Sequence, residues 1–130
     1  MFKDGKLAVE WYTKAAMQGD TRAQYNLGVM YEKGLGVIED AKVAVEWYTK
    51  AAMQGVAKAQ LNLGIMYYSG DGVIEDFVAS YAWMLNAKAN GTKEASQVIP
   101  ILKRKMTKEQ IEQGQALAKK LYQLIENRDD

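Results

Sequence analysis

The chain has 130 residues, with 17 Lys and Arg against 16 Asp and Glu, so its formal net charge is +1. Such a balance gives no reason to expect a polyanionic partner or an acidic substrate. The sequence contains no cysteine, which excludes disulfides and thiolate chemistry, and no histidine, which removes the commonest general base and metal ligand. We therefore expect neither a metal nor another cofactor.

The N-terminal residues lack the apolar run of a signal peptide, and no segment approaches the roughly 18 apolar residues that a transmembrane helix needs. The sequence thus predicts a soluble protein with no membrane insertion. Its expected compartment is the cytoplasm, or the periplasm if a signal peptide has been removed.

An internal repeat dominates the chain. The sequence AVEWYTKAAMQG at residues 8–19 recurs at 44–55, an offset of 36 residues. Aligning 7–40 with 43–76 gives 25 identities in 34 positions. A weaker third copy follows at the same offset and is marked by Trp83. Stacked repeats of this length build binding surfaces more often than active sites.

In chain order, the first predicted helix covers about residues 6–18 and corresponds to the second helix of a unit. A helix over about 21–33 follows, because apolar or small residues recur there with a 3.6-residue period. The glycines of the turn at 34–36 end that helix. Asp40 is well placed to cap the next helix, which Gly55 ends.

The second full unit follows the same pattern, with a glycine turn at 70–72, Asp76 as the N-cap of its second helix and Gly91 at that helix's end. A helix over about 93–105 then contains Pro100. Proline removes one backbone hydrogen bond, so we expect it to kink this helix or shift its start.

Thr107 and Gln110 fit a capping box at the start of a long, final amphipathic helix. The polar residues of that helix suit a capping element, which an open stack needs at its end. The sequence therefore predicts seven helices, no strand and one domain. Its parts are a half unit at 6–19, units at 20–55 and 56–91, and a degenerate unit with the capping helix at 92–127.

The clearest unit places small, aromatic and glycine residues at fixed spacing: Ala23, Leu27, Gly28, Tyr31, Gly34, Gly36, Val37, Asp40, Ala44, Trp47, Tyr48, Ala51, Ala52 and Gly55. The pattern recurs from Ala59 to Gly91, and the third copy departs from it at Ser80, Met84 and Pro100. It resembles the Sel1-like repeats, relatives of the tetratricopeptide repeats. The resemblance implies an all-α fold, an α/α right-handed superhelix with a concave face, and a scaffold or adaptor role.

In the stacks that this sequence resembles, the first helix of each unit lines the concave groove. An asparagine just before Leu-Gly often binds the backbone of a bound peptide there, and Asn26 and Asn62 occupy that position. The resemblance thus implies a partner-binding groove formed by exposed positions of two helices: Arg22, Tyr25, Asn26, Val29, Glu32, Lys33, Lys58, Leu61, Asn62, Ile65, Tyr68 and Ser69. Recent duplication, or a hydrogen bond between repeats, would also account for the paired asparagines.

The groove positions of the two units differ more than the rest of the repeat. Five of the six pairs change residue type, and only the asparagine pair is constant. Sequence variation on one face of a constant framework is typical of a surface that recognises a specific partner. Ordinary surface drift would give the same pattern.

Simpler roles account for the remaining residues that could carry chemistry. The Trp-Tyr pairs at 11–12 and 47–48 could stack on bases or sugars, but their helical spacing with alanines predicts core packing. The glycine turns lack the Lys-Ser/Thr of a phosphate loop, and capping accounts for the acidic pairs at 39–40 and 75–76 better than metal binding. The basic cluster around 103–105 lacks interleaved aromatic residues, so no nucleic-acid partner is expected.

Three functions compete. The first is a binding module that holds an unidentified protein or peptide in the groove. The second is a structural fragment of a longer repeat array that self-associates as a homodimer through its exposed N-terminal helix, at Leu7, Val9, Trp11 and Tyr12. The remote third is a hydrolase-type enzyme. Without His and Cys, it would need a constellation of Asp, Glu, Lys, Tyr or Ser that the sequence does not offer, so we expect no enzymatic activity.

Overall fold

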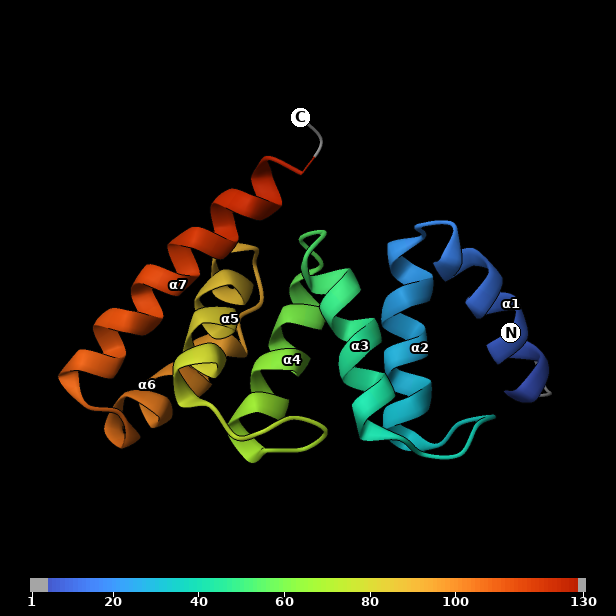
Figure 1. The fold of residues 1–130 in the computed structure, drawn as a ribbon, viewed down its shortest axis with the longest axis horizontal. Coiled ribbons are helices and arrows are strands. Elements are labelled where there is room, and N and C mark those ends of the chain that lie inside the picture. Colours follow the sequence, from blue (N-terminus) through green and yellow to red (C-terminus); the bar gives the residue numbers. More distant parts are fainter. Residues whose placement is uncertain (1–4, 129–130) are drawn as a thin grey trace.

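The computed structural model describes residues 5–128. Within this range it contains no strand and seven helices: α1 (Gly5–Met17), α2 (Thr21–Lys33), α3 (Ala41–Ala52), α4 (Ala57–Ser69), α5 (Phe77–Ala89), α6 (Ala95–Lys105) and α7 (Lys108–Glu126). From α1 to α6, each helix packs against the next along the chain. Figure 1 shows α1 to α5 side by side in chain order. The expected all-α fold is confirmed.

The three N-caps that the sequence predicted, at Asp40, Asp76 and Thr107, are present. The carboxylates of Asp40 and Asp76 accept the backbone amides of the third residue beyond them, at 3.2 and 3.0 Å. Asp20 caps α2 in the same way, at 3.1 Å. Thr107 and Gln110 form the predicted capping box at the start of α7, with bonds of 3.1 and 2.9 Å. Helices α4 and α6 have no side-chain cap, and the N-cap residue of α4 is Val56.

Helix pairs approach each other closely because glycine lies where the next side chain arrives. A Cβ built on Gly28 of α2 would lie 2.5 Å from ring carbons of Tyr48 in α3. Gly64 of α4 receives Met84 of α5 in the equivalent way. Since Tyr48 is fully buried, this contact lets its ring fill the space between α2 and α3.

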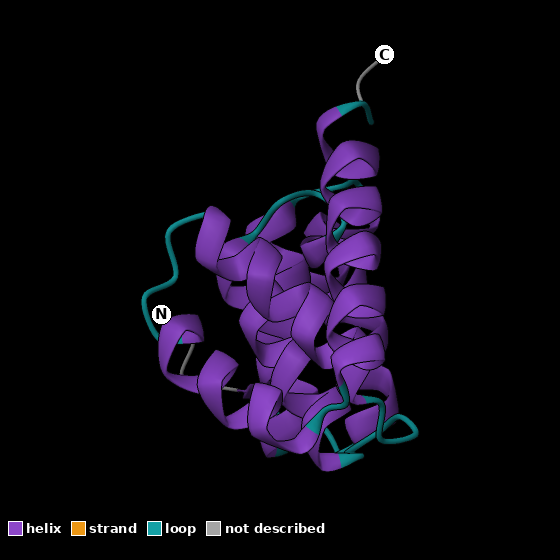
Figure 2. Cartoon of the chain, turned by 90° about the vertical axis from the view of Figure 1, so that its left-hand side faces the viewer, coloured by secondary structure: helices purple, strands orange, loops and turns teal. Residues whose placement is uncertain are grey.

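The last two helices leave this pattern. Pro100 lies inside α6, which begins at Ala95 rather than near residue 93 as predicted. It occupies the position of Gly28 and Gly64, so α6 offers the next helix no equivalent contact point. Helix α7 packs against α5 instead. There its own Gly114 meets the ring of Tyr81, to which an added Cβ would approach within 2.5 Å. Figure 2 shows α7 as a long rod along one side of the other helices, as expected of a cap.

Buried glutamine amides form hydrogen bonds between successive units and within each unit that sequence reasoning missed. The Gln24 amide donates to the carbonyl of Ala16 at 3.2 Å, and Gln54 donates to the Gln24 side-chain oxygen at 3.3 Å. One repeat further on, Gln60 donates to Ala52 at 3.0 Å, and Asn90 donates to Gln60 at 3.0 Å. The sequence did contain a sign of these bonds, because Gln24 and Gln60 occupy equivalent positions of the two units. Each bond satisfies a polar group that stacking would otherwise bury without a partner.

The three tryptophans occupy equivalent places with different exposure. Trp83 belongs to the core formed mainly by α3 and α4 and is 6% exposed, and Trp47 packs on the core of α1 and α2. Each therefore packs against the helix pair that precedes it. Trp11 belongs to the first described helix and is 54% exposed. The predicted core packing thus holds for Trp47 and Tyr48 but not for Trp11.

Candidate functional site

All twelve side chains of the predicted groove lie on α2 and α4, and none is buried. We call their common surface the α2–α4 face. Five of them are exposed: Arg22, Lys33, Lys58, Ile65 and Ser69. The other seven are partly buried, and several contact the core: Tyr25 and Val29 lie against the cluster of α3 and α4, and Leu61 and Tyr68 lie against that of α5 and α6. The face therefore combines exposed side chains with partly buried ones that also pack against the core.

A polar cluster lies beneath this face. The Tyr48 hydroxyl donates to Oε1 of Glu32 at 2.6 Å, and the rings of Tyr48 and Tyr25 lie 5.8 Å apart between centroids. Burial raises the pKa of Tyr48 far above its ordinary value, and the hydrogen bond to the Glu32 carboxylate raises it further. Tyr48 therefore stays neutral and acts as the donor, so Glu32 has an internal partner.

The two asparagines at the centre of the prediction differ in their surroundings. The Asn62 amide donates to the Tyr25 hydroxyl at 3.5 Å, a long hydrogen bond between α4 and α2. This contact is the bond between repeats that the sequence left as an alternative. The Asn26 amide makes no hydrogen bond to any other residue in the described part of the chain. Asn26 therefore keeps its whole amide available to a partner, whereas Asn62 spends one N–H on Tyr25.

A cavity of about 380 Å³ lies where α2 and α4 begin. Six residues line it: Thr21, Arg22, Tyr25, Asn26, Val56 and Lys58. Two of these are cations and none is an acid. Of the lining residues, only Thr21 and Val56 lie outside the predicted groove set. The fold thus brings the basic ends of two first helices to one opening.

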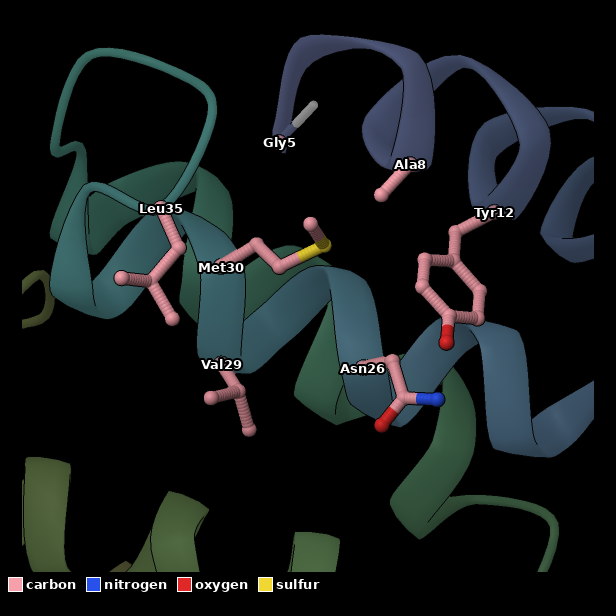
Figure 3. A pocket seen from close by; sticks show the side chains of 7 residues that line it. All are labelled: Gly5, Ala8, Tyr12, Asn26, Val29, Met30 and Leu35. Carbon is pink, nitrogen blue, oxygen red and sulfur yellow. The ribbon is translucent and has the colours of Figure 1, made fainter. Parts of the chain in front are cut away.

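A second cavity, of about 320 Å³, lies between α1 and α2, and its exposed lining is mostly apolar. Figure 3 shows Tyr12 of α1 and Asn26 of α2 at one end of it and Leu35 at the other. Asn26 therefore borders both cavities. Sequence reasoning assigned no role to Ala8, Met30 or Leu35, because the first two are ordinary apolar members of the helical pattern and Leu35 lies in the glycine turn after α2.

The predicted self-association surface on α1 is smaller than expected. Leu7 is 42% exposed and Trp11 54% exposed, and the Lys14 ammonium lies 5.4 Å from the centroid of the Trp11 ring. Val9 is not part of this surface, which corrects the sequence-based expectation. It is buried against α2, because it shares the inward face of α1 with Ala16. Tyr12 is partly buried on the same side.

Two kinds of site are absent from the described residues, 5–128. No group of three or more Asp or Glu side chains there is arranged to hold a metal ion. No helix in the same range has both the length and the apolar character needed to cross a membrane.

These features define a class of protein: an all-α solenoid in which glycine contacts bring the two helices of a unit together and buried amides join successive units. The family model described as Sel1 repeat matches residues 1–20, 21–56 and 57–92. The chain therefore belongs to the Sel1 repeat family. Repeat stacks of this kind form extended surfaces on which other proteins bind.

Two solved structures are similar to this chain. One is c5321, described as a protective antigen present in uropathogenic Escherichia coli strains and displaying an SLR fold. It matches with a TM-score of 0.91 and 36% identity over 96% of this chain and 27% of its own. The other is a Sel1 repeat protein from Oxalobacter formigenes, with a TM-score of 0.75 and 38% identity over 78% of this chain and 42% of its own. The chain thus spans less than half of either protein. No match was found among curated proteins.

Proposed function

We propose that this protein is a binding scaffold that holds a peptide or protein segment on its α2–α4 face. The observation that carries the proposal is the contrast between the two helices of each unit. The first helices present twelve unburied side chains on one face, whereas the second helices bury aromatic and small residues between units. The identity between repeats is high in the buried framework and low on this face.

The free Asn26 amide gives the face a means of binding a peptide backbone. An amide can donate to a carbonyl and accept from an N–H, and Asn26 spends neither capacity on another described residue. The neighbouring Val29 and Ile65 supply apolar contact, and Ile65 is 44% exposed. A face built on two units is small, so we expect dissociation constants of about 10 μM or weaker.

The test is to select binding peptides from a random library and to measure their affinity by fluorescence anisotropy. Asn26→Ala and Ile65→Asp should each weaken binding about tenfold or more without unfolding the protein. Glu46→Arg, on the exposed side of α3, is the control and should leave affinity unchanged. Equal affinities for all three variants and the original protein would place binding elsewhere and reject the proposal.

A second function, self-association through α1, is favoured by the exposure of Leu7 and Trp11. Large apolar side chains that lie together on a surface tend to find partners. Light scattering at increasing concentration should detect a homodimer, and Trp11→Glu should abolish it. A monomer throughout the accessible concentration range would exclude this function.

A further inference from the structure

The cavity at the start of α2 and α4 is electropositive in a protein that is nearly neutral overall. Arg22 and Lys58 line it, no acid does, and neither cation forms an ion pair within residues 5–128. The nearest acid in the sequence, Asp20, accepts the backbone amide of Ala23 as the N-cap of α2. The two cations therefore remain available to an anionic group from outside.

Aliphatic residues recur at one position of three successive first helices. Val29, Ile65 and Ile101 lie at successive offsets of 36 residues on α2, α4 and α6. Ile65 is 44% exposed and Ile101 is 43% exposed. Their spacing puts a β-branched side chain at the same position of each first helix. The exposed isoleucines are therefore part of a repeated pattern.

The charges near these aliphatic residues share one bias. In the register of the repeat, Lys33 corresponds to Lys105 two units on, and Arg104 falls at the position of Glu32 and Tyr68. Lys105 reaches this surface, because its ammonium lies 5.9 Å from the centroid of the Tyr68 ring.

Two acids lie at different positions of these first helices, Glu32 at that of Tyr68 and Arg104, and Glu94 at that of Arg22 and Lys58. Glu32 is held by the Tyr48 hydroxyl, and Glu94 is exposed at the start of α6. Cations therefore predominate near the aliphatic residues.

We propose that the occupant of this face is an acidic peptide segment with aliphatic side chains: a carboxylate lies between Arg22 and Lys58, and the aliphatic side chains rest on Val29, Ile65 and Ile101. The inference rests on the proposed function and specifies the chemistry of its partner. Charge complementarity selects the partner, and the apolar contact distinguishes it from a simple polyanion. Desolvation by the neighbouring aliphatic side chains strengthens the charge-assisted bonds.

The test uses short fluorescein-labelled peptides and the full chain. A peptide in which Leu and Glu alternate should bind at about 10–100 μM, and added salt should weaken it because the Debye length falls. A Leu/Lys peptide and a Ser/Glu peptide should each bind about tenfold more weakly. The double variant Arg22→Ala/Lys58→Ala should lose about tenfold in affinity for the Leu/Glu peptide. The control Lys42→Ala/Lys120→Ala removes the same charge from exposed sites on α3 and α7 and should lose nothing.

Residue 56 allows a sharper comparison of matched variants. Asp and Asn are both good N-caps, so Val56→Asp and Val56→Asn should give α4 the side-chain cap that it lacks. Only Asp adds a negative charge to the cavity. We expect the Asp variant to lose about tenfold in affinity for the Leu/Glu peptide, with the Asn variant within about twofold of the original protein. Far-UV circular dichroism checks that both remain folded.

The outcomes separate this inference from the proposed function. Failure of the Leu/Glu peptide to bind, or equal binding by Arg22→Ala/Lys58→Ala, would overturn the acidic-partner inference. Tighter binding of the Leu/Lys peptide, lost in Ile65→Asp, would overturn it while leaving the peptide-binding function intact. Tighter binding of a single-stranded oligonucleotide would replace the peptide by a nucleic acid. Selected peptides that are insensitive to every substitution on the face would reject the proposed function itself.

Discussion

Replacing Gly28 by alanine tests whether the close contact between α2 and α3 holds the stack together. The added Cβ would lie 2.5 Å from Cδ1 and Cε1 of Tyr48, whereas ordinary contact begins at 3.4 Å. The ring has no room to move aside, because Tyr48 is fully buried and its hydroxyl is bound to Glu32 at 2.6 Å. The two helices must therefore separate by about 1 Å, which forfeits a quarter to half of the dispersion energy across the contact.

The expected magnitude follows from two opposing terms. Overpacking a core costs about 1–3 kcal/mol, and replacing a helical glycine by alanine returns about 1 kcal/mol. Since the contact at Gly28 lies well inside the 3.0 Å that real Cβ atoms respect, the cost should lie at the upper end. We expect Gly28→Ala to lower the free energy of unfolding by about 2 kcal/mol, measured by urea denaturation with far-UV circular dichroism.

The repeat supplies its own control. The added Cβ in Gly64→Ala would lie 2.9 Å from the terminal methyl of Met84, a flexible side chain, and 3.3 Å from the backbone oxygen of Ser80, so the contact is tight but closer to the ordinary range than at Gly28. That variant should stay within about 1 kcal/mol of the original protein, and Tyr48→Met should rescue Gly28→Ala. A stability of Gly28→Ala equal to or above that of the original protein would refute the reasoning, as would a similar loss in Gly64→Ala.

Three further changes follow from the same contacts. Tyr48→Phe should cost about 1–2 kcal/mol, because the half-buried Glu32 carboxylate loses its donor. Since folding raises the pKa of Tyr48 above its unfolded value of 10.0, its contribution to stability is complete below that pH and falls as the pH rises beyond it. Tyr48→Phe should therefore flatten this loss in alkaline denaturation curves. Trp83→Ala should cost about 3–5 kcal/mol and Trp11→Ala less than about 1 kcal/mol by thermal unfolding, because only Trp83 is buried. Gln60→Ala should cost about 1–3 kcal/mol in urea, because it removes a buried side chain that donates to the Ala52 carbonyl and accepts from Asn90.

Local sequence patterns predicted the helices well. The caps at Asp40, Asp76 and Thr107 agree with the structure, because a cap depends only on residues within one turn. The glycines at 34 and 70 end their helices in the left-handed conformation for the same local reason.

Local patterns could not predict where the last helix packs. Pro100 in place of glycine closes the usual contact site on α6, and Gly114 opens one for Tyr81 on α7. Each residue is unremarkable within its own helix. That α7 packs against α5 rather than α6 depends on which side chain meets which glycine across the stack.

The candidate site, too, could be predicted from the sequence only in part. Helical periodicity and the family resemblance placed twelve residues on one face, and all twelve lie at the surface of α2 and α4. They could not distinguish Asn62, which binds Tyr25, from Asn26, whose amide binds no other described residue. Both asparagines have similar local sequences, and the difference arises from Tyr25 of the preceding first helix, which lies 37 residues before Asn62; within residues 5–128 no first helix precedes α2 to offer Asn26 the same partner.

The duplicated sequence was sufficient to establish the repeat, the boundaries of its helices and the face that each helix buries, because those properties depend on neighbours within one turn. It could not establish the exposure of Trp11 relative to Trp83, the amide bonds between units or the cavity shared by Arg22 and Lys58. These depend on contacts between residues in different units. Identical local sequences therefore acquire different surroundings once the units are stacked.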